Sequence, residues 1–497
     1  MSLNETAELV KAAQMNPDAI AKAGTDVALG LVNYDLQAPA INLYPWGEKI
    51  TPIRAALPRV ISQNGDTATR WKAITSIDST NMHPGLSEGN RGGIITQTLD
   101  NKTAAYISLG IENSVTFEAD AAAQGFQDVK AQSVEAALRS LMIAEEKLLF
   151  GGNSSVALGT TPTPTTALVA GGSLPDATYV TYCVALTHDG YLRTAVNATG
   201  IVQTISRTNA DGSTDTINGG SAGKSAAGTS RTTASTNNSV SATVTAVTGA
   251  VAYAWYFGTS GAERLHSITT INSQLFTTVA GASNQLFSAL AAGDNSAEGN
   301  YSFDGLLYAT ALGSSTGAYL ATLATGTAGT GTTLTTDSAG GVAEIETALQ
   351  SFYDNYRVSP DTIWCNSAQL KKITSLVIAG GAAPLYRFNS DAKATGGISG
   401  GAQVGSYLNK ITQDLIQVKV HPFCPPGTIM FTSSTIPYPL SGVGAVAQVK
   451  LRQRDYYQIE YPLGVNGRRY SFGVYNGNGS VLQVYAPFAF GAIKNIA

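Results

Sequence analysis

The sequence carries little charge. Only 13% of its 497 residues are Asp, Glu, Lys or Arg, and the formal net charge is −4. A dedicated nucleic-acid-binding protein has a surplus of Lys and Arg, so this composition excludes one, and nucleic acid would have to meet a local patch. Because 43% of the residues are hydrophobic, the composition also excludes a disordered chain. The length allows two to four domains, each with its own core.

Cysteine and long apolar runs are scarce as well. Cys183, Cys365 and Cys424 are an odd number of widely spaced thiols, which excludes a disulfide framework and fits a reducing site of assembly. The first residues, MSLNETAELVK, have acids where a secretion signal needs bases, and no apolar segment follows. No run approaches the roughly 18 apolar residues of a membrane span. We therefore expect a soluble protein made in a cytoplasm.

The first half of the sequence predicts an arm, a hairpin and a helix. Residues 1–59 are polar and interrupted by prolines, so they form either a mobile arm or one that folds against a partner. Residues 60–110 contain the extended runs ATRWKAITSI, GNRGGIITQT and AAYISLG, which predict a long projecting hairpin without a core of its own. Apolar residues at helical spacing then predict a helix from Phe117 to Phe150, ending at Gly151-Gly152.

The composition changes in the centre of the chain. Between Gly151 and Asn300 there are 43 Ser and Thr but a single Lys, and no helical periodicity. The runs YVTYCVALT, SVSATVTAV and VAYAWYF alternate as strands do, with Trp255 as the expected core aromatic, and Asp189-Gly190 predicts a hairpin turn. These features predict an all-β domain inserted at 156–298.

The mixed pattern resumes after the insertion. A regular apolar stripe predicts a helix from Val342 to Tyr356, and Asn366-Ser367 predicts the cap of a helix that ends at Val377. From Ala445 the chain is strand-like: AVAQVKLRQRDYYQIEY, RRYSFGVY, an Asn-Gly-rich turn, and SVLQVYAPF. The predicted class is α+β, split by the β insertion.

The strongest candidate motif for chemistry is NGGSAGKS, Asn218 to Ser225, which resembles a phosphate-binding loop. Its first glycine is replaced by Asn218, and the AAGTSRTTAST that follows is no helix, so a helix N-terminus would not meet a phosphate. A flexible loop is the prediction here.

The titratable residues form no recognisable catalytic or metal-binding set. The histidines, which we expect at surfaces or in turns, are His83, His188, His266 and His421. Cys424 near His421 is a possible nucleophile pair, but a small buried residue in a Pro-rich corner is the favoured interpretation. Glu145 and Glu146 point about 100° apart on a helix, and a solvated helix face explains them. We predict no catalytic, cofactor-binding or metal site, and no enzyme.

Basic residues near the C-terminus leave two interpretations open. Lys450, Arg452 and Arg454 alternate along one strand, and Arg468 and Arg469 follow. Such a face suits contacts with phosphates or an acidic neighbour, and it equally suits a solvated strand edge protected from mispairing.

The order of elements resembles the major capsid proteins of tailed bacteriophages, with the HK-97-like fold. The segments that carry the resemblance are TPIRAALPRV to ATRWKAI, AAQGFQDVKAQSVEAALRSLMIAEEKLLFGG, IETALQSFYDNYRVSPDTIWCNSAQLKKI, and VKLRQRDYYQIEYPLG to RRYSFGVYNGNGSVLQVYAPFAFGAI. They cover roughly 350 residues outside the insertion and contain no invariant motif. The insertion, from SATVTAVTGAVAYAWYFG, resembles an immunoglobulin or fibronectin sandwich that lacks the disulfide.

The resemblance implies a domain division. It gives an N-terminal arm at 1–59, an extended loop at 60–110, a peripheral domain with a spine helix at 111–155, the inserted immunoglobulin-like domain at 156–298, an axial domain at 299–442, and the closing peripheral strands at 443–497. Some related shells cross-link a loop Lys to a neighbour's Asn; Lys72 and Lys102 lie in that region, but the sequence shows no such chemistry.

The resemblance also implies a function. The chain would be a subunit of an icosahedral virion capsid around double-stranded DNA, assembling as hexamers and pentamers in the bacterial host cytoplasm. Expected partners are its own copies, portal or scaffold proteins and, weakly, the packaged DNA, without membrane or cofactor. The inserted sandwich would project from the surface as a removable decoration, so that deleting Thr160 to Ala297 leaves assembly possible. The alternative is a tail or adhesion protein whose sandwich binds host carbohydrate.

Overall fold

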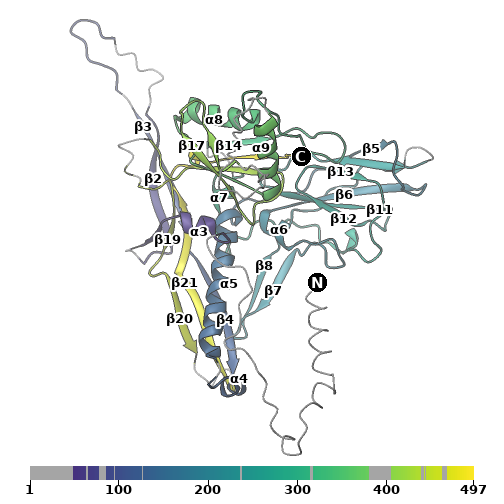
Figure 1. The fold of residues 1–497 in the computed structure, drawn as a ribbon, viewed down its shortest axis with the longest axis horizontal. Helices are drawn as coiled ribbons and strands as arrows, with labels where there is room; N and C mark the ends of the chain where they lie inside the picture. The colour runs from purple at the N-terminus through teal and green to yellow at the C-terminus, as the bar shows by residue number, and fades with distance from the viewer. Residues whose placement is uncertain are drawn as a thin grey trace, which may run out of the picture.

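A computed structural model gives the fold of this chain. It describes residues 49–62, 65–77, 85–94, 96–125, 127–234, 238–313, 317–379, 404–437, 442, 444–461 and 467–497. Most of the predicted arm, together with His83 and Ile95, lies outside these residues. Helices and strands both build the body (Figure 1), which confirms the α+β class. In the described ranges no helix is long and apolar enough to cross a membrane.

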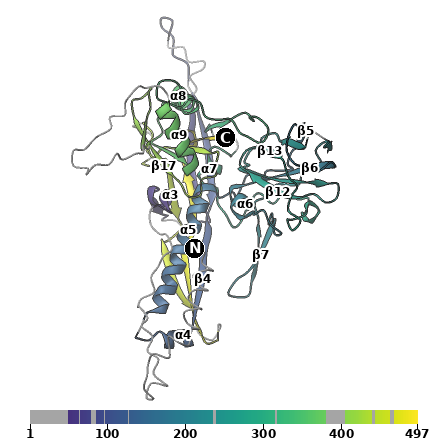
Figure 2. The same cartoon turned by 45° about the vertical axis from the view of Figure 1, so that its right-hand side comes forward.

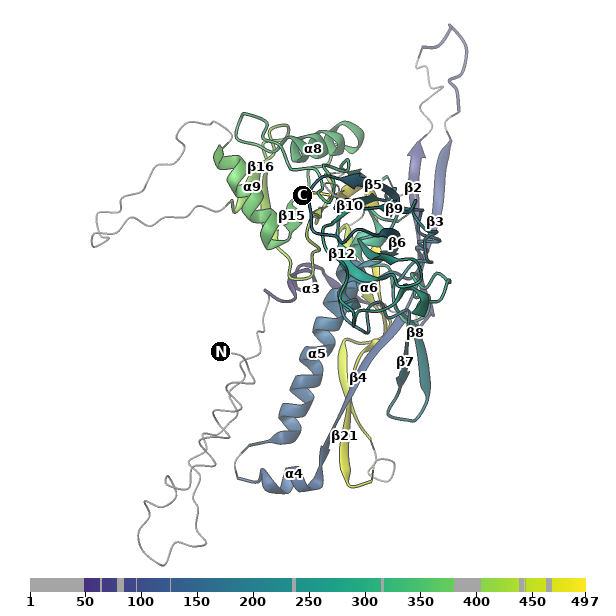
Figure 3. The same cartoon turned by 90° about the vertical axis from the view of Figure 1, so that its right-hand side faces the viewer.

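A five-stranded sheet and one long helix form the elongated lower body. The strands are β1 (Arg59–Ile61), β4 (Ile107–Thr116), β19 (Ala447–Leu451), β20 (Tyr456–Tyr461) and β21 (Arg469–Val484). β21 pairs with β4 along one edge and with β20 and then β19 along the other. The helix α5 (Val129–Gly151) runs beside β4 and β21 (Figure 3), and its Leu141 packs against Val474.

The predicted Asn-Gly turn inside β21 is wrong. β21 continues through it as one 16-residue strand. The pairing with β4 jumps from Asn476 to Ser480, and Gly477 and Asn478 take positive φ angles of 64° and 52°. These residues therefore form a bulge, which absorbs extra residues without reversing the chain. Neighbours on both edges hold the two halves of the strand in line.

The predicted helix from Phe117 to Phe150 is two helices. α4 (Phe117–Ala122) and α5 are separated by the segment 123–128. The Asp128 side chain accepts a hydrogen bond of 3.0 Å from the backbone N–H of Ala131, so the sequence restarts the helix with an N-cap. The predicted end holds, because α5 finishes at Gly151 with Gly152 as its C-cap.

A two-stranded ribbon leads away from this body. Among the described strands, β2 (Ala68–Ile77) and β3 (Gln97–Ala105) pair only with each other, and Figure 1 shows them running outward past the body. Ile74 lies opposite Leu99 in the register, and both side chains are 59% exposed. Ile94, in the described part of the connection, is 96% exposed. The ribbon therefore presents apolar side chains without a core beneath them.

A second body lies above the long helix. Its six-stranded sheet has the order β14 (Tyr319–Thr322), β22 (Gly491–Lys494), β18 (Ile429–Thr432), β15 (Thr362–Cys365), β17 (Leu415–Val420) and β16 (Ser406–Leu408). The helices α8 (Ala343–Tyr356) and α9 (Ser367–Ala379) accompany this sheet. Ile345, Leu349 and Phe352 of α8 are buried, as the stripe predicts. Asn366 Oδ1 accepts from the Ala368 N–H at 2.9 Å, so the predicted cap is also present.

The central segment forms two facing antiparallel sheets beside the long axis (Figure 2). One sheet has the order β13 (Ser273–Phe276), β10 (Ser239–Thr243) and β5 (Thr165–Val169). The other has the order β12 (Arg264–Thr269), β11 (Ala252–Thr259), β6 (Thr178–Leu186) and β9 (Arg231–Thr232). Trp255, which is 0% exposed, shares one core with Val240 and Phe276 of the facing sheet. Trp255 is thus the predicted core aromatic.

Two further elements of this segment face the long helix. β7 (Thr204–Thr208) and β8 (Thr214–Asn218) form a separate hairpin. The predicted turn at Asp189-Gly190 is instead the start of a short helix, α6 (His188–Arg193), which Thr187 caps by accepting from the Gly190 N–H at 3.2 Å. A Thr-His-Asp-Gly sequence suits a helix start because the threonine hydroxyl satisfies an unpaired N–H group.

The insertion shares a core with the rest of the chain. Val251, at the entry to β11, belongs to the central cluster with Leu307 and Tyr308 of α7 (Leu306–Ala309). The Tyr308 hydroxyl donates to Gly249 O at 2.9 Å and accepts from the His188 N–H at 3.0 Å. This shared core argues against the expectation of a removable decoration, because removing the insertion would open the central core.

Candidate functional site: a buried ionic junction

Glu145 and Glu146 of α5 are both 0% exposed, so the predicted solvated helix face is wrong. Their directions do differ, as neighbours on a helix must, and each carboxylate consequently reaches a different set of partners. Buried carboxylates require charged or hydrogen-bonding partners. Both have them, and together they form what we call the ionic junction: Glu145, Glu146, Arg54, Arg59, His421, Tyr456 and Asn476.

Glu145 connects α5 to the N-terminal segment and to the sheet. Its Oε1 accepts from Arg59 NH1 at 3.0 Å and from Asn476 Nδ2 at 2.7 Å. Its Oε2 accepts from Arg54 Nε at 3.2 Å and from the Tyr456 hydroxyl. Four donors on three segments therefore satisfy one carboxylate. The separation in sequence reaches 331 residues for the pair Glu145 and Asn476.

Arg59 bonds a second carboxylate in addition to Glu145. Besides Glu145 it bonds both oxygens of Asp455, at 3.0 Å and 2.8 Å. Burial on its own lowers the pKa of Arg59, but the hydrogen bond with Asp455 and the charge of Glu145 outweigh burial and raise that pKa. Burial and the Glu145 charge also raise the pKa of Tyr456. The guanidinium and the phenol therefore keep their protons throughout the physiological range.

The Glu146 side chain, which extends from α5, caps the N-terminus of another helix, α3 (Pro52–Ala56). This helix begins at a proline, and its N-cap Thr51 makes no side-chain capping bond. Glu146 provides the missing acceptors instead, at 2.8 Å from the Ile53 N–H and 2.7 Å from the Arg54 N–H. A carboxylate at this position satisfies unpaired N–H groups and complements the helix dipole. Pro52 thus starts a helix where the sequence predicts an interruption.

His421 brings the upper body to the junction. Its Nδ1 accepts from the Phe423 N–H at 3.2 Å, so Nε2 carries the proton and donates to Glu146 Oε1 at 2.8 Å. The ring is 0% exposed and stacks on Phe150 with centroids 4.5 Å apart. His421 is therefore not at the surface, but it does begin a turn as predicted, because the Cys424 N–H donates to His421 O at 3.2 Å. Its nearby Cys424 is buried, and burial raises the pKa of that thiol, which excludes an activated nucleophile pair.

His188, which belongs to the insertion, also packs against the Phe150 ring. The ring centroids are 5.0 Å apart, and His188 Nε2 donates to Phe423 O at 2.8 Å. His188 is only 1% exposed and is the first residue of α6, so it takes neither the surface nor the turn position that the sequence predicts. The approach is so close that a Cβ on Gly151 would lie 2.4 Å from the imidazole. Burial lowers the pKa of His188 to about 4, and the ring is neutral at pH 7.

The remaining predicted candidates are distributed around the molecule. Asn218 to Ser225 is largely buried and has no helix after it, so it is neither a phosphate loop nor the flexible loop expected. Arg452 and Arg454 lie beyond the end of β19, where Arg452 donates to Gly65 O at 2.9 Å and Arg454 covers the Tyr457 ring. The described residues contain no metal-binding cluster of three His, Cys, Asp or Glu.

The other thiols and the remaining described histidine are also accounted for. Cys183 and Cys365 are buried and free, and burial raises the pKa of both, that of Cys365 to about 12. His266 is half-buried, and its Nε2 lies 3.1 Å from Thr278 O. The described residues therefore contain no exposed low-pKa thiol and no pair of histidines set for metal binding.

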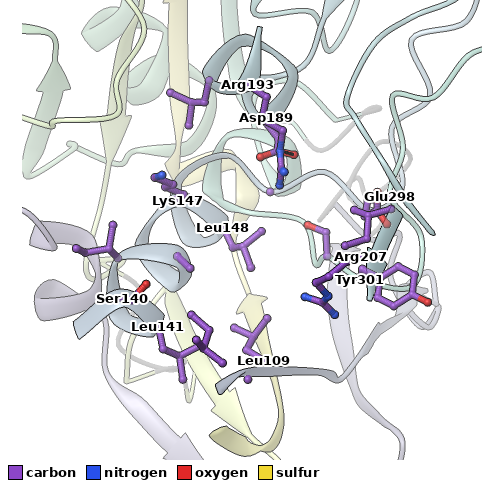
Figure 4. Close-up of a pocket in the computed structure, with 18 of the residues that line it drawn as sticks. Leu109, Ser140, Leu141, Lys147, Leu148, Asp189, Arg193, Arg207, Glu298 and Tyr301 are labelled. Carbon is purple, nitrogen blue, oxygen red and sulfur yellow. Dashed lines mark hydrogen bonds and ion pairs between the residues drawn. The ribbon is translucent and has the colours of Figure 1, made fainter. Parts of the chain in front are cut away.

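A cleft of about 1080 Å³ separates α5 from the insertion. Figure 4 shows Ser140, Lys147 and Leu148 of α5 on one wall and Arg207, Glu298 and Tyr301 on the other. Most of its charges are already paired, as in the Arg193 to Asp189 bridge of 2.6 Å. Burial raises the pKa of Glu298 to about 7. The cleft thus offers mixed polarity without a convergent catalytic set.

Acid should destabilise the fold through His188. Its folded pKa of about 4 lies below the ordinary value of 6.5, so the neutral ring stabilises the fold fully above pH 6.5, and this contribution is lost as pH falls towards 4. Between pH 7 and pH 5 we expect a loss of about 2 kcal/mol.

Urea unfolding at a series of pH values tests this expectation. His188→Gln keeps a side-chain N–H donor but does not titrate. Between pH 7 and pH 5 its free energy of unfolding should therefore fall by about 2 kcal/mol less than that of the wild type. Equal slopes for the two proteins would show that the buried ring does not control acid stability.

Comparisons with known proteins yield similarities to solved structures alone. No protein-family model matches the chain, and no curated protein does. The chain is similar to the capsid of a native GTA particle, with 9% identity, a TM-score of 0.46 and coverage of 97% of this chain and 100% of that one. The capsid of Myoviridae phage XM1 is similar with 10% identity and a TM-score of 0.41, over 95% of this chain and 100% of that one. The cyanophage A-1(L) capsid asymmetric unit is similar with 11% identity and a TM-score of 0.44, over 94% of this chain and 97% of that one.

Proposed function

We propose that this chain is the major capsid subunit of a tailed-phage type virion, which assembles as hexamers and pentamers into a shell around double-stranded DNA. The observation that carries the proposal is the ribbon of β2 and β3. It pairs with no other strand of the described chain, and its cross-strand apolar pair, Ile74 and Leu99, is exposed. A lone two-stranded ribbon with an uncovered apolar pair is marginal in water. A second subunit would supply the missing cover.

The junction supports the same proposal from inside the subunit. A subunit that carries a long unsupported ribbon needs a rigid base to place the ribbon on a neighbour. Glu145 and Glu146 provide one, because they join the N-terminal segment, α5, β21 and the loop after β17 through buried charged bonds. Such bonds have strict geometry and fix relative orientation. None of their partners is left free to act on a substrate.

The insertion is proposed to be an immunoglobulin-like domain on the shell surface. The order β12, β11, β6, β9 matches strands G, F, C and C′ of that fold, and β5 and β10 take the places of B and E. The last strand, β13, lies beside β10 at the sheet edge. Contacts with portal, scaffold and packaged DNA, and assembly in the host cytoplasm, belong to the same proposal.

Electron microscopy of the purified full-length chain tests the function. We expect rings with fivefold and sixfold symmetry, or closed shells, as salt or crowding agent is raised. Trimers or tubes would instead favour a tail or adhesion protein, and monomers under every condition would contradict both.

The double variant Ile74→Ser/Leu99→Ser should prevent assembly while the subunit stays folded. Each residue contributes about 1.5–3 kcal/mol when fully buried, so losing both should raise the concentration needed for assembly by at least about tenfold. Light scattering measures that concentration, and urea unfolding of the dispersed subunit should be unchanged.

The matched control is Asp100→Ser/Lys102→Ser, which removes an exposed ion pair of 2.5 Å from the same ribbon. Exposed pairs contribute little, so assembly should persist. If the apolar double variant assembles like this control, the ribbon is not an assembly surface.

A further inference from the structure

A small cavity lies between the insertion and the six-stranded sheet. Its volume is about 70 Å³, well above the roughly 10–15 Å³ that one water needs. The insertion provides Thr248, Tyr253 and Thr270, and the other body provides Thr322 and Lys494. None of the residues that line it is acidic. The cavity thus spans the two bodies at the place where the insertion is anchored.

Lys494 is a buried cation without a counter-charge. It is the last residue of β22 and is only 8% exposed. Its ammonium donates to one group, the carbonyl oxygen of Ala250. Within the described ranges it forms no ion pair. An ammonium has three N–H donors, and lysine is almost never buried unless it is paired.

The ammonium keeps its charge in spite of this environment. Burial lowers the pKa of Lys494 from its ordinary value to about 8, so the group remains mostly protonated at pH 7. A protonated amine beside an open cavity favours an anion there, because a buried charge is costly until it is paired.

Hydroxyl groups complete the set of donors. Thr248, Thr270 and Thr322 line the cavity, where Thr248 and Thr322 are exposed and Thr270 is half-buried, and among the described residues their hydroxyls have no protein hydrogen-bond partner. The Tyr253 hydroxyl accepts from the Val247 N–H at 3.0 Å, which leaves its own proton available. Burial raises the pKa of Tyr253 to about 12, so that proton stays in place.

We propose that this cavity binds one small inorganic oxyanion of the size of phosphate, paired with Lys494 and hydrogen-bonded by the surrounding hydroxyls. The bound anion would neutralise the buried ammonium and tie the insertion to β22. This site is independent of the assembly surface proposed above, so either proposal can fail without the other.

Isothermal titration of the full-length chain with inorganic phosphate, at constant ionic strength, tests the site directly. We expect saturable binding of one phosphate per chain, competition by sulfate, and a higher unfolding temperature when phosphate is present. A nucleoside monophosphate should compete less well than sulfate, because a cavity of about 70 Å³ cannot enclose its sugar and base. Binding that fails to saturate by about 10 mM would overturn the proposal.

Lys494→Met should weaken phosphate binding by about 10- to 100-fold, the effect of one charge-assisted hydrogen bond. The matched control is Lys419→Met, which removes a lysine that lies over the Trp364 ring, away from the cavity. Its phosphate affinity should equal that of the wild type, and an equal loss in both variants would overturn the site.

A second variant keeps the test open if Lys494→Met does not fold. Thr270→Val/Thr322→Val retains the ammonium and the size of the side chains but removes two donors. We expect about tenfold weaker binding from this variant. Unchanged affinity in a folded protein would show that these hydroxyls do not face a bound anion.

Discussion

Replacing Glu145 by alanine should destabilise the subunit by about 3 kcal/mol. The substitution removes the acceptor of four hydrogen bonds and leaves Arg54 and Arg59, whose side chains are 20% and 16% exposed, without their shared carboxylate. Removing one partner of a buried pair costs about 3–5 kcal/mol, and the lower end applies because Arg59 retains Asp455. Urea unfolding of the dispersed subunit measures this loss.

Glu135→Ala is the matched control on the same helix. Glu135 is 57% exposed, and its one ion pair within the described residues is with Arg139, one helical turn away. Exposed pairs of this kind contribute about 0.3–0.5 kcal/mol, so the midpoint should hardly move. Glu145→Gln should fall between the two, since an amide oxygen still accepts but the charge is gone. Equal effects of the two alanine variants would mean that the junction does not hold the subunit together.

The burial of Glu145 and Glu146 could have been predicted from their spacing to the apolar residues of the same helix. Glu145 lies four residues after Leu141 and four before Leu149, and all three are buried. Glu146 has the same relation to Phe150. A carboxylate on the buried stripe of a helix must face the core, because residues four apart share a face. What the sequence did not contain is the identity of the partners, since Asn476 and His421 are brought there only by tertiary packing.

Local periodicity predicted the elements that depend on local contacts. The stripe of α8, the Asn366 cap and the alternation of β6 and β11 all reappear in the structure. The errors occur where neighbouring segments override local preference. The Asn-Gly sequence at 476–479 favours a turn in isolation, but pairing along both edges of β21 makes it a bulge.

Removing the whole insertion, from Thr160 to Ala297, should abolish soluble assembly. The contacts that would be lost are buried. Val251 fills part of the central core, and His188 packs against Phe150. Two buried polar groups would lose their partners as well, namely the Tyr308 hydroxyl and the Lys494 ammonium. Each unsatisfied group costs about 1–3 kcal/mol, and a missing core side chain costs about as much again.

These losses add up to a large part of the 5–15 kcal/mol by which a typical protein is stable. We therefore expect the deletion protein in the insoluble fraction, with no rings or shells in electron micrographs. The control shortens only the β7 to β8 hairpin at its exposed tip, Asn209 to Ser213, and this variant should still assemble.

The cause can be separated from the deletion itself. If unsatisfied polar groups are responsible, then Tyr308→Phe and Lys494→Met added to the deletion should restore part of the soluble protein, because both remove the group that has lost its partner. A deletion protein that assembles as well as the full chain would instead show that the insertion is a removable module. In that case the central core must repack without Val251. The buried contacts of the insertion would then orient the domain and contribute little to the stability of the subunit.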